Sequence, residues 1–224
     1  MAPLCGALIT ILEPEAYGVA MAILTLNVNF PAAVLLLALS QGPLLAQPKE
    51  VILLRHGDKL IPRTSYNLSP KGLRRAIAIG RLLPACFGPI DQIGSFMFRI
   101  NTQKNARSYQ SAVPLAVATG INIILFTDSA SSTPDVGARL LQAPWVQDQR
   151  LVLFWEHRRM PALAKALGWA GMLPIADDDF GGLYQLRYTQ GTFRPEVSVS
   201  RQSDLFQQSC FIHAKSTLPD VALP

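Results

Sequence analysis

The stretch VILLRHGDK, residues 51–59, decides the fold of this chain. Its apolar start at 51–54 is typical of a strand that is covered on both faces of a sheet, and the predicted strand begins one residue earlier, at Glu50. The apolar run stops at two basic side chains, Arg55 and His56, and Gly57 follows them. In open parallel sheets, functional groups gather just beyond the carboxyl ends of the strands. The stretch therefore predicts a central strand with a site at its end.

Strand-like and helix-like segments alternate downstream of this strand. Apolar runs predict further strands at 93–100, 121–126, 150–157 and 181–189. Helical spacing of apolar residues predicts helices at 69–84, 105–119, 133–142 and 160–168. This alternation predicts an α/β fold, a three-layer α/β/α sandwich with a mostly parallel central sheet.

The first predicted helix has clear start signals. Ser69 is a good N-cap, and Pro70 suits the first helical position. Helical spacing predicts that one face of this helix packs on the core, through Leu73, Ala76, Ile77 and Gly80. Arg75 is expected to point to solvent. In the second helix, Pro114 is expected to delay the start or to introduce a kink.

The size and composition of the chain fit one domain after a leader. Half of the 224 residues are hydrophobic and 16% are charged, which allows one globular core, predicted over 47–224. The net charge is +5, but the basic residues are scattered and form no long run, so no nucleic-acid partner is predicted. Nothing in the sequence predicts an oligomeric state.

Residues 1–46 are predicted to be a leader. No charged residue occurs from Ala16 to Pro48, and the run AAVLLLAL at 32–39 has the length of a signal-peptide core. Cleavage after Ala46 would export the domain to the periplasm or the medium, whereas an uncleaved leader would be a membrane anchor. Met21 is a second candidate start, which would make residues 1–20 an upstream extension. The leader is the one membrane contact that is predicted.

Two cysteines, Cys86 and Cys210, remain once the leader is removed. In an oxidising compartment they can form a disulfide, and they can equally stay buried as free thiols. Their separation in sequence does not decide between the two states.

Two histidines and two arginines are predicted to converge at the strand ends. His56 follows the first strand and His157 ends the predicted strand at 150–157, while Arg107 lies at the start of the second helix. The guanidinium groups of Arg55 and Arg107 match the oxygens of a phosphoryl group in charge and geometry. An oriented imidazole can form a covalent bond to phosphorus. The pattern therefore predicts a phosphate site with a histidine nucleophile.

These segments resemble the histidine phosphatase superfamily, which has the phosphoglycerate-mutase-like fold. The similar segments are Arg55-His56-Gly57, the helix start NLSPKGLRRAIAIG at 67–80, Arg107-Ser-Tyr-Gln110-Ser111-Ala112, and His157 as the second catalytic histidine. The form Trp155-Glu156-His157 resembles a subset of small bacterial members. The similarity extends from about residue 50 to about residue 188.

The resemblance implies a mechanism and assigns roles to particular residues. His56 would attack the phosphoryl group of a small phosphorylated substrate and become a phosphohistidine, which water would hydrolyse. Arg55, Arg107 and His157 would hold the phosphoryl oxygens. Gly57 and Lys59 are further candidates for substrate binding, and the resemblance implies no metal and no cofactor.

The general acid that protonates the leaving group is not assigned by the resemblance. Asp58 and Asp135 are the main candidates, and Asp128 and Glu156 are further ones. Glu156 is disfavoured, because neighbours in a strand point to opposite faces and His157 is expected to face the site.

Two other functions are compatible with the same motifs. One is an anion-binding protein of the same fold that does not turn over, and the other is a phosphotransferase of the phosphoglycerate mutase kind. The acidic run Asp177-Asp178-Asp179 lacks the spacing of a cation site and is expected to be a solvated loop.

Overall fold

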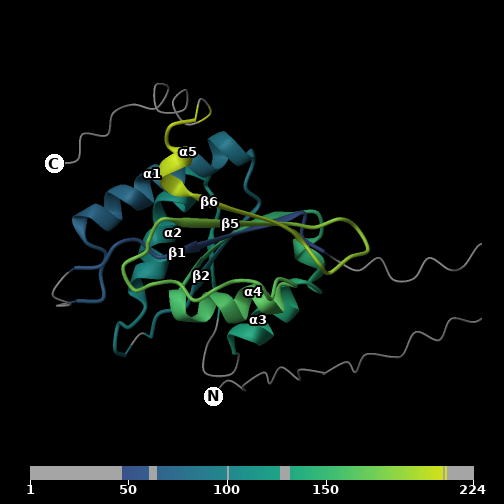
Figure 1. Ribbon diagram of the computed structural model, residues 1–224. Coiled ribbons are helices and arrows are strands. Elements are labelled where there is room, and N and C mark those ends of the chain that lie inside the picture. The colour runs from purple at the N-terminus through teal and green to yellow at the C-terminus, as the bar shows by residue number, and fades with distance from the viewer. Residues whose placement is uncertain (1–46, 61–64, 100, 127–131, 209, 211–224) are drawn as a thin grey trace, which may run out of the picture. The chain divides into compact units, whose positions relative to one another are not determined.

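The computed structural model describes residues 47–60, 65–99, 101–126, 132–208 and 210 (Figure 1). The predicted leader at 1–46 and the candidate acid Asp128 lie outside these residues. In the part of the chain that is described, no helix is long and apolar enough to cross a membrane.

The described residues form a six-stranded sheet with the order β3-β2-β4-β1-β5-β6. Its strands are β1 Glu50–Arg55, β2 Gln92–Phe96, β3 Ile123–Phe126, β4 Arg150–Trp155, β5 Gly182–Arg187 and β6 Glu196–Arg201. The pairs β3–β2, β2–β4 and β4–β1 are parallel, whereas β5 and β6 add to the sheet in antiparallel fashion. The predicted mostly parallel sheet is confirmed, and β6 is an addition that was not predicted.

Helices cover both faces of the sheet. They are α1 Pro70–Phe87, α2 Ala106–Thr119, α3 Thr133–Leu140, α4 Met160–Ala166 and α5 Gln202–Leu205, with short 3-10 turns η1 Pro144–Val146 and η2 His157–Arg159. Figure 1 shows α1 and α5 on one side of the strands and α3 and α4 on the other, and α2 packs into the same core as α1 and α5. The predicted three-layer α/β/α arrangement is confirmed.

The central strand β1 is buried along its whole length. Val51 and Leu53 pack into the core under α3 and α4, whereas Ile52 and Leu54 pack into the core under α1 and α2. Successive side chains of a strand point to opposite faces, so an unbroken apolar run supplies both cores. This two-sided burial fixes the position at which the strand ends and the polar residues begin.

The start of α1 is as predicted, and part of its predicted core face, Ala76 and Gly80, is buried. The Ser69 side chain caps the helix by accepting a hydrogen bond from Gly72 N at 3.0 Å. Leu73 is 43% exposed, while Gly72 is buried, and Arg75 is half-buried instead of pointing to solvent. The reason is the close approach of α1 to the loop after β1: a Cβ added at Gly57 would lie 2.8 Å from the Gly72 carbonyl oxygen.

Other element boundaries also differ from the predictions. Pro114 lies inside α2 and does not delay its start at Ala106. The sequence suggests Thr133 as the N-cap of the helix at 133–142, but the N-cap of α3 is Ser132. Strand β4 ends at Trp155, so His157 belongs to the turn η2 and not to the strand. This last difference matters for the site.

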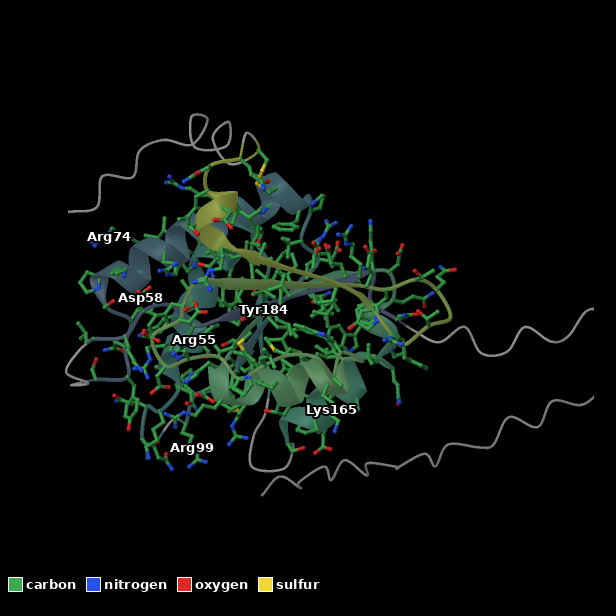
Figure 2. The ribbon with its side chains drawn as sticks, in the orientation of Figure 1. Arg55, Asp58, Arg74, Arg99, Lys165 and Tyr184 are labelled. Atoms are coloured by element: carbon green, nitrogen blue, oxygen red, sulfur yellow. A yellow bond between two sulfur atoms is a disulfide. The ribbon has the colours of Figure 1, made fainter. Side chains whose placement is uncertain are left out.

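A disulfide joins Cys86, in the last turn of α1, to Cys210, which follows α5 (Figure 2). The sequence left the pairing open, and the structure decides it. The bond links positions separated by 124 residues, so it fastens the last described part of the chain to the α1 layer.

Candidate active site

The pairing of β1 with β4 brings the two predicted histidines together. Arg55 and Trp155 are partners in the parallel register, and His56 N donates a hydrogen bond to Trp155 O at 3.2 Å. The imidazole rings of His56 and His157 then lie edge to face, with centroids 6.1 Å apart. Two side chains separated by about 100 residues thus share the carboxyl end of the sheet, as expected for an open parallel arrangement.

His56 is held as a neutral imidazole with one nitrogen available. Its Nδ1 lies 2.8 Å from Gly57 O, and a carbonyl oxygen can only accept, so Nδ1 carries the proton. None of the described residues hydrogen-bonds Nε2, which therefore keeps its lone pair. Burial lowers the pKa of His56 to about 3, and the nearby Arg55, Arg107 and His157 act in the same direction. An unprotonated Nε2 is the form that can act as a nucleophile.

This depressed pKa predicts the behaviour of His56 on acidification. In the unfolded chain the imidazole takes up a proton near its ordinary pKa of 6.5, whereas in the folded protein it stays neutral until about pH 3. Since the unfolded state binds more protons in this window, stability should fall as the pH is lowered from 6.5 towards 3. NMR should show a constant His56 ring shift between pH 8 and 5, and His56→Asn should lose part of the acid destabilisation. A His56 shift that titrates near pH 6.5 would contradict this.

Arg55 is buried and anchors the loop at 176–180, which lies between α4 and β5. Its NH1 donates to the carbonyls of Ala176 at 2.7 Å and Asp179 at 2.6 Å, and its NH2 donates to Asp177 O at 2.8 Å. The guanidinium also stacks over the Phe180 ring, 4.0 Å from its centroid. Burial lowers the pKa of Arg55 to about 10, so it remains a cation at neutral pH.

One donor of Arg55 is left over. Its Nε is buried and has no hydrogen-bond acceptor among the described residues. Buried polar groups are nearly always paired, and a charged donor without an acceptor is costly. An anionic ligand with acceptor oxygens would remove that cost.

Arg107 reaches the same region from the first turn of α2. It is buried, donates from NH1 to Ser65 O at 3.1 Å, and lies close enough to His56 to lower the pKa of that imidazole. The Ser111 hydroxyl fixes α2 here, because it donates to Arg107 O at 2.7 Å and accepts from Gly57 N at 2.8 Å. This contact explains why a hydroxyl residue follows four positions after the arginine.

His157 lies between two carboxylates. Its Nε2 is 2.7 Å from Asp177 Oδ1, and its Nδ1 is 3.0 Å from Glu156 Oε1. Burial lowers the pKa of His157, and the two carboxylates oppose that shift. The expectation that Glu156 points away from His157 was wrong, because strand alternation no longer applies once β4 has ended at Trp155.

Solved structures with this arrangement of strands and helices include the protein histidine phosphatase SixA in complex with tungstate. It is 12% identical, with a TM-score of 0.51 over 70% of this chain and 99% of that one. Others are a mycobacterial glucosyl-3-phosphoglycerate phosphatase (18% identity, TM-score 0.48, 68% and 97% of the chains) and a phosphoglycerate mutase from Bacillus anthracis (12%, 0.44, 76% and 98%). No protein-family model and no curated protein sequence matches the chain. The chain has the histidine phosphatase fold.

At the level of the fold, the resemblance seen in the sequence is confirmed. The motif-bearing residues of this histidine phosphatase fold come from segments far apart in the chain: Arg55 and His56 after β1, Arg107 in α2 and His157 after β4. The structure brings these four side chains together, as predicted. Their roles in a reaction are a matter for proposal.

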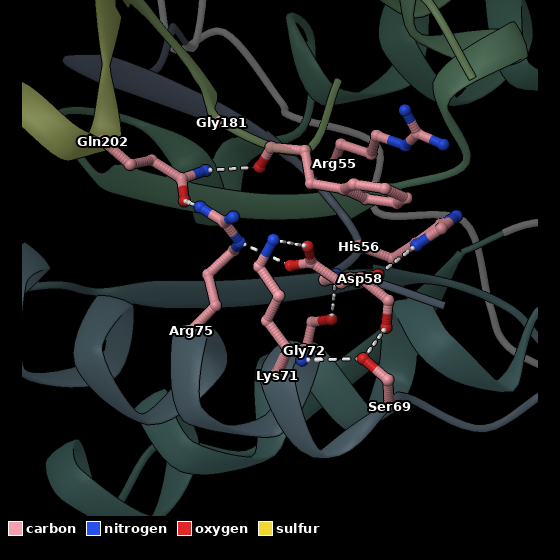
Figure 3. Close-up of polar contacts among 12 residues, drawn as sticks. Arg55, His56, Asp58, Ser69, Lys71, Gly72, Arg75, Gly181 and Gln202 are labelled. Atoms are coloured by element: carbon pink, nitrogen blue, oxygen red, sulfur yellow. Dashed lines mark hydrogen bonds and ion pairs between the residues drawn. The ribbon is translucent and has the colours of Figure 1, made fainter. Parts of the chain in front are cut away.

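The two main candidates for the general acid are placed elsewhere. The Asp58 carboxylate pairs with Arg75 at 2.7 Å and Lys71 at 3.3 Å, and Figure 3 shows it turned towards them while the His56 imidazole points the other way. Burial alone would raise the pKa of Asp58, but these two partners lower it. Asp135 is exposed and caps α3 through Ser132, whose hydrogen bonds lower the pKa of Asp135. Both carboxylates are thus kept ionised by structural partners.

Gly57 and Lys59, the candidates for substrate binding, have different surroundings. Gly57 has no positive φ; its small size admits α1, and its N–H is already bonded to Ser111. The structure therefore gives Gly57 a packing role in place of the sharp turn that a glycine suggests. Lys59 reaches the site, with Nζ 3.9 Å from Asp177 Oδ2 and 6.0 Å from the centroid of Phe180.

The loop at 176–180 contacts the site through a residue of the acidic run that was expected to be solvated. Asp177 contacts His157, whereas Asp179 pairs with Arg201 at 2.7 Å, so the acidic run is not simply solvated. Its carboxylates diverge, and no cluster of metal-ligating side chains occurs among the described residues. The sequence signal is weak: an acidic run followed by an aromatic residue, about 20 positions after His157.

Proposed function

We propose that this protein hydrolyses a phosphomonoester through a phosphohistidine on His56. The observation that carries the proposal is the state of His56: a buried neutral imidazole beside His157 and two guanidinium groups, with Nδ1 fixed by Gly57 O and Nε2 without a partner among the described residues. That is the form and setting in which an imidazole attacks an anionic phosphorus centre.

In the proposed reaction, His56 Nε2 forms a bond to phosphorus while the bond from phosphorus to the ester oxygen breaks. The alcohol leaves with one added proton. Water then attacks phosphorus, the bond to Nε2 breaks, and inorganic phosphate leaves. Arg55, through Nε, together with Arg107 and His157, would stabilise the charge on the phosphoryl oxygens; charge-assisted hydrogen bonds contribute about 1.5–3 kcal/mol each.

We also propose that the domain is exported, as its leader implies. The disulfide between Cys86 and Cys210 supports this, because disulfides persist in oxidising compartments and are rare in the cytosol. Cleavage after Ala46 remains the expected processing step.

The experiment that tests the proposed function is base-quenched labelling with a phosphate-labelled aryl ester. The wild-type protein should trap acid-labile, base-stable label on His56, and His56→Asn, which keeps the size of the side chain, should trap none. An anion-binding protein without turnover would bind phosphate and trap no label. A phosphotransferase of the mutase kind would pass the label to an added alcohol in preference to water.

A further inference from the structure

The Asp177 carboxylate is bonded to His157 Nε2, the hydrogen-bond donor that the proposed reaction needs for a phosphoryl oxygen. Its Oδ1 lies 2.7 Å from His157 Nε2 and 3.7 Å from an NH2 group of Arg158, and its Oδ2 lies 3.9 Å from Lys59 Nζ. The side chain is 56% exposed, although the backbone of its loop is fastened to Arg55. Asp177 is thus an anion on a fixed loop with a side chain that is able to rotate.

The other carboxylates near the site have structural partners or face elsewhere. Asp58 is bound to Arg75 and Lys71, and Asp179 is bound to Arg201 and to Gly181 N. Glu156 lies on the Nδ1 side of His157, away from the nitrogen that would meet a phosphoryl oxygen. Among the described residues, Asp177 is the carboxylate in contact with that nitrogen.

We propose that Asp177 is the catalytic general acid of this site, an inference that rests on the proposed function. A phosphoryl group that binds His157 displaces the carboxylate by a side-chain rotation and leaves it beside the ester oxygen. Asp177 takes up a proton from solvent as the substrate binds, and it gives this proton to the ester oxygen as the bond from phosphorus to that oxygen breaks. In the second half of the reaction its carboxylate accepts a proton from the attacking water, as the bond from phosphorus to His56 Nε2 breaks.

The electrostatics of the site allow Asp177 to change its protonation state when substrate binds. In the free protein, the hydrogen bond with His157 and the charge of Lys59 lower the pKa of Asp177, so it is an anion. A bound phosphoryl dianion takes over these cationic partners and places negative charge next to the carboxyl group. Both changes raise its pKa, which is the direction that a general acid requires.

The proposal predicts a dependence on the leaving group. An alkyl alcohol leaves poorly as an alkoxide and needs the proton, whereas nitrophenolate is stable as an anion and does not. In the full-length protein, Asp177→Asn should lower kcat for a simple alkyl phosphate by about 100-fold or more and change kcat for a nitrophenyl phosphate by no more than about threefold. Because the variant also lacks the competing negative charge, inorganic phosphate should inhibit it more strongly, by about tenfold.

Asp178→Asn is the matched control, since it makes the same charge change in the same loop without a contact to His157. It should resemble the wild type with both substrates. Equal losses with both substrates in Asp177→Asn would mean that the residue only supports the loop, and no loss with either would mean that it plays no part; both results overturn the inference while leaving the phosphohistidine mechanism intact. The same losses in Asp178→Asn would also overturn it. If the wild type released phosphate from neither ester, the proposed function would fail first, and this inference with it.

Discussion

Replacing His56 with alanine is expected to lower the rate of phosphate release from an aryl phosphate by about four orders of magnitude or more. The variant lacks the single nitrogen that can bond to phosphorus, and the remaining groups only bind and polarise the ester. Steady-state release of nitrophenolate measures the loss, and far-ultraviolet circular dichroism checks that the variant is folded. Because the deleted ring leaves a buried cavity, added imidazole should restore part of the activity of the variant.

A matched variant separates the nucleophile from its neighbour. His157→Ala removes an imidazole that is equally buried and lies 6.1 Å away, but leaves the Nε2 lone pair of His56 in place. It should reduce the rate by about 100-fold, the scale for loss of one group that stabilises transition-state charge, and it should still trap label on His56. Full activity in His56→Ala, or label on His157, would refute the mechanism.

The parts of the fold that the sequence predicts well are those where a local pattern and the tertiary environment agree. Strand β1 is buried on both faces and reads as an unbroken apolar run, and α1 begins at a cap that its own residues supply. Leu73 shows the limit of such patterns. Helical spacing places it in the core with Ala76 and Gly80, which are buried, but the close contact between Gly57 and Gly72 leaves Leu73 exposed.

Strand β6 was missed although a signal is present. Its sequence EVSVSR alternates apolar and polar residues, as an edge strand with one exposed face does. The antiparallel addition of β5 and β6 after a series of parallel strands has no local signature. It depends on pairing with β1, which lies more than 100 residues earlier in the chain.

The candidate site likewise contains residues that local patterns predict and a residue that they do not. Arg55, His56 and Arg107 lie at element ends, where a motif and a parallel sheet together predict their convergence. Asp177 lies in a loop without periodicity, and its place depends on three backbone carbonyls bonding to Arg55, more than 120 residues away. Such a contact leaves no pattern in either segment, so the position of Asp177 required the structure.

The disulfide gives the largest expected effect on stability. Removing it by the double substitution Cys86→Ala and Cys210→Ala should lower the free energy of unfolding by about 4–5 kcal/mol, the chain-entropy estimate for a closed loop of more than 100 residues. The sequence separation of 124 residues sets this scale. Urea unfolding of the variant and of the oxidised wild type measures the difference, and thiol titration of the wild type should find Cys86 and Cys210 without free thiols.

Removal of the disulfide is also expected to affect the candidate active site. The chain from β6 to Cys210 includes Gln202, which is buried and donates from Nε2 to Phe180 O at 3.2 Å and Gly182 O at 3.0 Å. These bonds support the loop that carries Asp177, so freeing the C-terminal segment should loosen that loop before the whole domain unfolds. Hydrogen exchange at 176–182 should therefore rise in the double variant more than exchange in β1. An unaltered free energy of unfolding in the double variant would mean that the core holds this segment without the bond.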